Sequence, residues 1–405
     1  MDSQYRKLFN QAYSDAVYQR YEKDLTRRLG HFGFRLAESP VFLPPQLRER
    51  LESSAVAIVD QLLDPKRLVA MKKAIPARWD TPGMDDCASF IQVDFAVTLA
   101  SDGSLEPKLI ELQGFPSLTA MQVIQRDSWA DTLKTLPGLD LDWSCWFSGL
   151  TREKFLELGK RTILGDQKPE HVILMDIDPP NQKTVPDFVA TKQLYGVDAV
   201  CPTSLEKEGK QLYRRVDGKR VPVRRIYNRV VFDELERKGL TLPFDYREEL
   251  DVEWTPHPNW FWAWSKYSLP FLEHPSVPRA TLVSDLKEIP ADLEQNYVLK
   301  PLFSFAGGGV NVDPTRADLD RIPDAERPFW CVQEKIEYTP KLEAADGGGV
   351  RVEVRMMFFR PTSGGQARPI LAQNLCRLSR GKMIGVDFNK DKTWVGSSVG
   401  IWPRA

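Results

Sequence analysis

QVDFAVTLASDGSLEPKLIELQGFPSL, residues 92–118, is the stretch of sequence that decides the fold. The run from 90 to 99 alternates and is rich in strand formers, SDGSLEP is typical of a turn, and KLIELQGF predicts a second strand. The stretch therefore predicts a β-hairpin that carries two acids, Asp94 and Glu111. Because alternate strand residues share a face, Glu111 and Gln113 point to one side. Their oxygens, with those of Asp94, suit a hard cation such as Mg²⁺, although a solvated hairpin face also explains the acids.

The composition is that of an ordinary globular protein. The chain has 405 residues, a net charge of −1, 42% hydrophobic residues and 27% charged residues, which predicts two or three domains and disfavours disorder. No strongly basic balance indicates a nucleic-acid surface, no apolar run approaches the roughly 20 residues that span a bilayer, and the first residues lack an apolar signal core. Five scattered cysteines without a CxxC pair disfavour a disulfide framework. We therefore expect a cytoplasmic enzyme without nucleic-acid or membrane partners, and leave a homo-oligomer open.

The rest of the chain changes character in blocks. Residues 1–75 show helical spacing of apolar side chains among charges. Residues 170–240 alternate apolar runs with a helix that stops at Gly196, which predicts α/β structure. The arginines of VPVRRIYNRVVFDEL would suit an acidic substrate, or equally a solvated strand edge. The last 140 residues alternate short strands and helices.

A glycine-rich loop follows a lysine in NYVLKPLFSFAGGGVNV, residues 296–312. The pattern predicts a strand that ends at Lys300, a loop, and a second strand. Gly307, Gly308 and Gly309 allow the backbone to approach a ligand and to point N–H groups at it, and the lysine supplies a charge for phosphate oxygens. A flexible hairpin loop with a plain strand-end lysine is the simpler interpretation of this stretch alone.

Three more segments extend the pattern toward the C-terminus. FWCVQEKI (329–336) is an apolar strand interrupted by Gln333 and Glu334, and VRVEVRMMFF (350–359) places Glu353 and Arg355 on one face. ILAQNLCRLS (370–379) carries Arg377, and DFNKDKTWVG (387–396) brings Asn389 into a loop. Structural ion pairs for the arginines and a turn cap for the asparagine explain these residues about as well.

This ordered series resembles the ATP-grasp superfamily, whose members hold ATP between two α+β lobes. The matched stretch runs from about Lys266 to Gly396. The resemblance implies ATP and Mg²⁺ as cofactors. It implies that Lys266 and Lys300 contact the α- and β-phosphates, and that the loop with Ser304, Gly307, Gly308 and Gly309 closes over the phosphates. The hinge that reads the adenine would be Gln333, Glu334 and Ile336, and Glu343 would bind the ribose. Arg355, Arg377 and Asn389 would face the γ-phosphate or an acyl phosphate.

The metal-binding acids of that superfamily usually come last, whereas here their best match is the hairpin at 92–118. This order resembles the circularly permuted ATP-grasp arrangement of the glutathionylspermidine synthase-like group, in which Asp94, Glu111 and Gln113 would hold the metal. Glu111-Leu-Gln113-Gly-Phe-Pro-Ser-Leu follows the group's hairpin closely. Two residues depart from it: Gln113 replaces the usual Asn, and Gln92 stands where the synthetases carry an Arg, which puts the glutathionylspermidine substrate in doubt.

The resemblance implies an α/β fold of α+β lobes, circularly permuted, with a helical N-terminal arm and a Rossmann-like pre-ATP-grasp domain. The expected parts are a helical region at 1–85, a metal hairpin at 86–125, an α/β substrate domain at 126–240, an ATP-grasp N-lobe at 241–326 and a C-lobe at 327–405. The implied activity is ATP-dependent carboxylate–amine ligation through an acyl phosphate, with small-molecule or peptide carboxylates and amines as substrates. A kinase on the same scaffold and a non-catalytic nucleotide-binding protein remain the alternatives.

Overall fold

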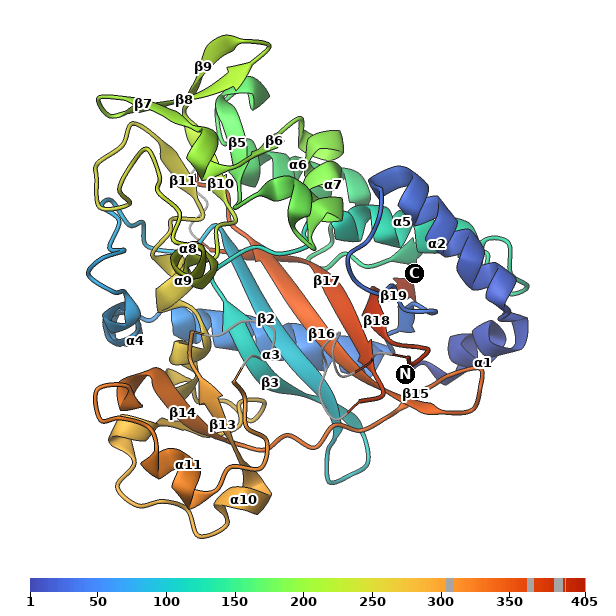
Figure 1. Ribbon diagram of the computed structural model, residues 1–405. Coiled ribbons are helices and arrows are strands. Elements are labelled where there is room, and N and C mark those ends of the chain that lie inside the picture. Colours follow the sequence, from blue (N-terminus) through green and yellow to red (C-terminus); the bar gives the residue numbers. More distant parts are fainter. Residues whose placement is uncertain (304–308, 363–367, 382–388, 390, 405) are drawn as a thin grey trace.

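The computed structural model describes residues 1–303, 309–362, 368–381, 389 and 391–404. Its centre is an antiparallel sheet in which strands from both ends of the chain lie side by side (Figure 1). The expected hairpin forms two of its strands, β2 and β3, and β2 also pairs with β16, more than 200 residues away along the chain. The order is β18–β17–β16–β2–β3, and β15 pairs with β16. The strands are β2 (Phe90–Leu99), β3 (Leu105–Gln113), β15 (Leu342–Glu343), β16 (Gly349–Phe359), β17 (Ile370–Ser379) and β18 (Gly396–Ser398).

The N-terminal helices cover this sheet and tie it to the end of the chain. Helix α3 packs against β3 and β16, and α2 packs against α5 (Figure 1). Asp2 begins α1 by accepting hydrogen bonds from the backbone amides of Gln4 and Tyr5, and Asp64 caps α4 in the same way. The helices are α1 (Ser3–Ala12), α2 (Asp15–Leu29), α3 (Pro45–Leu62), α4 (Pro65–Met71) and α5 (Met121–Leu133). A small sheet of β1 (Val41–Phe42), β19 (Gly400–Pro403) and β4 (Trp143–Ser144) joins both ends of the chain.

A second, parallel sheet lies beside one end of the large one (Figure 1). Its order is β11–β10–β5–β6, with the bounds β5 (Val172–Met175), β6 (Asp198–Val200), β10 (Arg225–Asn228) and β11 (Glu253–Thr255). The segment that the sequence predicts to be α/β therefore contains parallel strands, and α7 connects β5 to β6. The associated helices are α6 (Arg152–Leu164), α7 (Val185–Tyr195) and α8 (Phe232–Lys238), and β7 (Glu206–Glu208), β8 (Gln211–Val216) and β9 (Lys219–Val223) form an antiparallel flap.

A small lobe with its own core completes the molecule. Its sheet has the order β12–β14–β13, and β13 ends at the expected lysine and proline. The second strand expected after the glycine loop is wrong as stated, because Asn311 makes only a single bridge to Leu299. The elements are α9 (Trp260–Ala263), the 3₁₀ helix η5 (Lys266–Phe271), β12 (Ala280–Leu282), α10 (Leu293–Asn296), β13 (Tyr297–Pro301), α11 (Arg316–Asp320) and β14 (Trp330–Glu334).

No helix in the described ranges is both long enough and apolar enough to cross a membrane.

Candidate active site

A cavity of about 890 Å³ opens where the large sheet, the small lobe and the parallel sheet meet. Its volume lies within the range of small-molecule sites. Most of the residues singled out in the sequence line it, although they come from segments as far apart as β3 and the loop after β17. These are Glu111, Gln113, Lys266, Lys300, Gln333, Glu334, Ile336, Arg355, Arg377 and Asn389.

Asp94 does not line this cavity, because two arginines cover it. The Arg355 guanidinium binds it with two hydrogen bonds, from Nε to Oδ1 at 2.6 Å and from Nη2 to Oδ2 at 2.7 Å. Arg377 adds a third, from Nη2 to Oδ2 at 2.6 Å. Strand register brings them together, since Arg355 on β16 pairs directly with Asp94 on β2. Asp94 is 1% exposed, so both of its oxygens are committed to cations inside the protein.

Glu353 is the third acid of this cluster, and it also binds Arg377. Arg377 Nη2 lies 2.9 Å from Glu353 Oε2, and the Tyr338 hydroxyl donates to the other carboxylate oxygen. Burial raises the pKa of Glu353, while Arg377 and the Tyr338 hydrogen bond oppose that shift. Both partners line the cavity. The Glu-x-Arg spacing of β16 was the sequence signal for this acid, and Tyr338 had none.

Glu111 is the acid that faces the cavity. Burial disfavours its charge, but Lys266, Arg377, Arg355 and Lys300 together lower its pKa to about 2. Lys266 Nζ lies 3.6 Å from Glu111 Oε2, and Gln113 Nε2 donates to Oε1 at 3.1 Å. Glu111 therefore stays ionised within a ring of four basic side chains.

Lys300 lies at the junction between the small lobe and the large sheet. Its ammonium donates to Gln333 Oε1 at 2.6 Å and to the carbonyl of Ile110 at 3.2 Å. Burial lowers its pKa. On the far side of this contact, the backbone amides of Glu334 and Lys335 donate to Arg279 and Asn296. No hydrogen bond of the Ile336 amide is found within the described residues, so this amide remains the part of the expected hinge that can read a ligand edge.

Several other expected residues have different placements. Asn389 lines the cavity, but its Oδ1 accepts from Ser379 Oγ and from the amides of Arg380 and Gly381, as a turn cap would. Glu343 is the exposed residue of β15 and is not among the residues that line the cavity, so its ribose contact stays a prediction. Gly309 has φ +71° and packs against Pro301 rather than lining the cavity. Ser304, Gly307 and Gly308 lie outside the described residues.

The donor set fits a magnesium ion only in part. Within the described ranges, no three His, Cys, Asp or Glu side chains form a group that could hold a metal. Asp94 does not fit as a ligand, because two guanidinium groups occupy its oxygens. Glu111 and Gln113 do fit, since both line the cavity and carry side-chain oxygens, and Mg²⁺ commonly uses one or two protein oxygens together with substrate phosphates.

At its other end the cavity reaches the parallel sheet, where Arg229 belongs to the arginine cluster of the sequence and Asp176 was not singled out. Asp176 follows β5 and Arg229 follows β10, and both line the cavity. The sequence signal for Asp176 was its position directly after the apolar run VILM, which is the carboxyl end of a parallel strand. Arg225, from the arginine cluster noted above, is instead buried against Glu253 and two backbone carbonyls.

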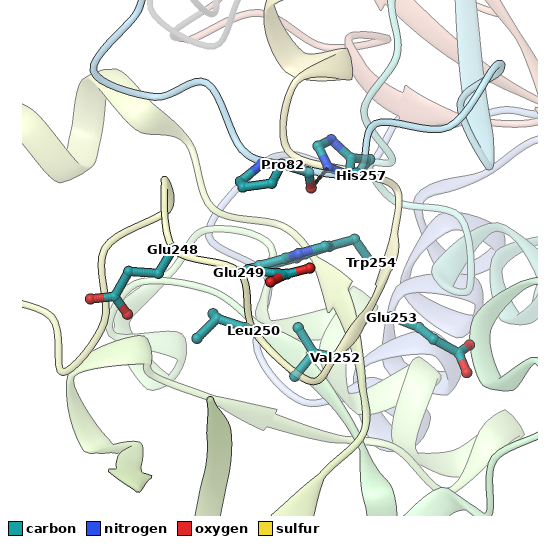
Figure 2. Close-up of a pocket in the computed structure, with 9 residues that line it drawn as sticks. Pro82, Glu248, Glu249, Leu250, Val252, Glu253, Trp254 and His257 are labelled. Atoms are coloured by element: carbon teal, nitrogen blue, oxygen red, sulfur yellow. Dashed lines mark hydrogen bonds between the residues drawn. The ribbon is translucent and has the colours of Figure 1, made fainter. Parts of the chain in front are cut away.

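A second, smaller cavity of about 290 Å³ lies near the flap (Figure 2). It is lined by Glu248, Glu249 and Glu253, but each pairs with a basic side chain. His257 accepts from the Asn259 amide through Nδ1, so Nε2 is left to donate to the Pro82 carbonyl. Because its hydrogen-bonding groups have protein partners, this cavity is a weaker candidate for chemistry.

Comparison with known proteins gives a likeness of fold. No family model and no curated protein matches the sequence. Among solved structures, one described as a glutathione synthetase-like effector from Globodera pallida, in its apo form, is similar over 96% of this chain and 97% of that chain. The TM-score is 0.53 and the sequence identity 13%. The chain thus shares a mixed α/β fold with a glutathione synthetase-like protein, and the substrate does not follow from it.

Proposed function

We propose that this chain is an ATP-dependent carboxylate–amine ligase of the circularly permuted ATP-grasp type. In this proposal residues 86–125 and 327–405 build one lobe, residues 241–326 build the other, and ATP lies between them. The observation that supports it is the cluster in the large cavity: Lys266, Lys300, Arg355 and Arg377 come from four separate segments and surround Glu111. Several fixed cations in a partly enclosed site favour a polyphosphate and the charge that develops during phosphoryl transfer.

The proposed roles follow from position. Lys300 bridges the small lobe and the large sheet, and in this proposal its ammonium would bind the phosphates beside the hinge at Ile336. Lys266 would bind the same triphosphate. Arg355 and Arg377 cannot rotate freely because Asp94 holds them, and such preorganised cations would orient the substrate carboxylate and stabilise the acyl phosphate. Bound Mg²⁺, arriving on ATP and held by Glu111 and Gln113, would neutralise phosphate charge.

Trapping of an acyl phosphate tests the activity. The protein is incubated with ATP, Mg²⁺, a panel of carboxylates and hydroxylamine, and hydroxamate formation is measured. A ligase gives hydroxamate with at least one carboxylate, whereas a kinase gives a stable phosphorylated product instead. Neither product from any member of the panel, with no ADP release, would contradict the proposal.

Nucleotide binding gives a separate test with a matched control. Lys300→Met removes a buried ammonium at the lobe junction, so we expect ATP affinity, measured by calorimetry, to fall by about tenfold or more. Lys192→Met is the control, because Lys192 pairs with Asp198 on the surface. Equal ATP affinity in both variants would place the nucleotide elsewhere.

A non-catalytic nucleotide-binding protein is the second candidate, and two observations favour it. Asp94 is withheld from the cavity by its arginines, and Gln92, which stands where the resembled group has an arginine, donates to the carbonyl of Ser117 instead. ATP binding without hydroxamate or phosphorylated product would support this candidate over the ligase.

A further inference from the structure

The parallel sheet has a point at which its strand order reverses. From β5 the chain passes through α7 to β6 on one side, while β10 lies on the other side of β5. In open parallel sheets, ligands bind in the crevice at the carboxyl ends of the strands at such a point. Here that crevice is one end of the large cavity, because the residues that directly follow β5 and β10 line it.

Strand register places Asp176 and Arg229 together at this edge. Met175 pairs with Asn228, so the next residue of each strand is Asp176 on β5 and Arg229 on β10. Both residues are buried, with exposed fractions of 5% for Asp176 and 2% for Arg229. Arg229 is already neutralised, since its Nη1 donates to Asp187 Oδ2 at 2.6 Å and Asp187 is fully buried.

Unlike Arg229, Asp176 has no oppositely charged partner bound to it among the described residues. Its Oδ1 accepts from the Ile177 amide at 2.7 Å, and within the described residues no side-chain donor reaches its carboxylate. Glu234 also lines this end, and it is bound by Gln182 and by Lys238 at 2.8 Å. Among the described residues that line the cavity, Asp176 is therefore the buried acid with no cation bound to it.

The surroundings also favour exchange of a proton at Asp176. Burial raises its pKa to about 7, with Glu234 adding to the shift and with Arg229, the Ile177 amide and Lys238 opposing it. The buried Tyr246 hydroxyl also interacts with it. A carboxyl group that titrates near neutral pH can accept a proton from an ammonium ion and later release it to solvent.

We propose that the carboxyl edge of the parallel sheet, at Asp176 between β5 and β10, is the subsite for the amine substrate, with Asp176 binding the ammonium group and accepting its proton. This inference rests on the proposed ligase function. The ammonium gives one proton to the Asp176 carboxylate, and the neutral amine attacks the acyl-phosphate carbonyl. The C–N bond forms, the C–O bond to phosphate breaks, and the second proton leaves with the phosphate.

The test is a carbon-13 NMR titration of aspartate carboxyls in the full-length protein, with ethylamine as the probe and ethanol as an uncharged ligand of similar size. Asp176→Asn assigns the Asp176 signal by its disappearance. Asp178→Asn is the matched control, because Asp178 lies two residues away and binds Asn181. We expect ethylamine, and not ethanol, to lower the pKa of Asp176 by about one unit, as a bound cation should.

The outcomes separate this subsite from the ligase proposal, because ATP binding and hydroxamate formation are measured on the same preparation. Ethylamine that leaves the titration of Asp176 unchanged overturns the subsite, even if hydroxamate forms. Absence of ATP binding overturns the ligase, and a response of Asp176 to ethylamine would then show an amine site of different purpose. An equal response to ethanol would also overturn the subsite, because charge would not be what is recognised.

Discussion

The two cavities of this protein contain similar residues and differ in what those residues do. The smaller cavity is lined by Glu248, Glu249 and Glu253, whose side chains are 42%, 76% and 51% exposed and pair with nearby surface or strand cations. At the large cavity, Glu111 and Glu353 line the wall and Asp94 lies behind Arg355 and Arg377, and the side chains of Asp94, Glu111 and Glu353 are only 1%, 19% and 5% exposed. Charge that is buried interacts strongly and is screened little. The difference shows that a candidate active site is marked by buried charges brought together from separate segments, and not by the number of acidic residues.

Removal of the central acid of the cluster should have the largest effect. Asp94→Ala leaves Arg355 and Arg377 without their shared counterion, and breaking a buried pair costs roughly 3–5 kcal/mol. We expect a clear fall in the urea midpoint and a weaker affinity for ATP. An unchanged midpoint would mean that the two arginines find other partners, and the contrast between the cavities would then be smaller than the geometry indicates.

Asp176 should give the large cavity a dependence on pH. Its folded-state pKa is about 7, above the ordinary value of 3.8, so the folded state holds the proton more tightly than the unfolded state. Stability is therefore greatest below about pH 4 for this group and falls as pH rises toward 7. Asp176→Asn should raise stability at pH 8, by at most roughly 4 kcal/mol, and hardly change it at pH 4. Equal effects at both pH values would contradict the raised pKa.

The wall of the large cavity should also resist an added methyl group. Gly396 lines the cavity with φ +122°, and a Cβ there would lie 2.2 Å from the Arg35 carbonyl oxygen. Gly396→Ala should destabilise the protein by roughly 1–3 kcal/mol. Gly218→Ala in the flap is the matched control, because its φ is +77° with nothing within 4 Å. Similar losses of stability in both variants would show that the positive φ alone, and not the contact with Arg35, causes the destabilisation.

The smallest effect is expected in the smaller cavity. Glu249→Gln removes an exposed partner of Lys210, and such surface pairs contribute little. The melting temperature, ATP binding and hydroxamate formation should all stay at their wild-type values. A loss of ATP affinity in this variant would make the smaller cavity part of the site, and the two cavities would then not differ in function.

The sequence indicated much of this arrangement, and its limits have physical causes. The hairpin at 92–118 and the strands that carry Arg355 and Arg377 were predictable, because period-two alternation and turn residues are local signals. Placement in one cavity was expected for Glu111, Lys300 and Arg377, and the structure brings them together. The strand after the glycine loop was wrong, since only local composition supported it, and Glu343, which the resemblance gave to the ribose, is not among the residues that line the cavity.

By itself the sequence determined which faces of the strands carry charge. Only the tertiary structure decided which residues each charged side chain contacts. Asp94 was expected to hold a metal, and it holds two arginines because β16 pairs with β2 in a register that sets Arg355 opposite Asp94. Such a register between strands about 260 residues apart depends on the packing of the whole sheet, and a local sequence pattern does not determine it. Asp176 carried a local signal too, but its meaning came from β10, which places a neutralised Arg229 beside it at the edge of the cavity.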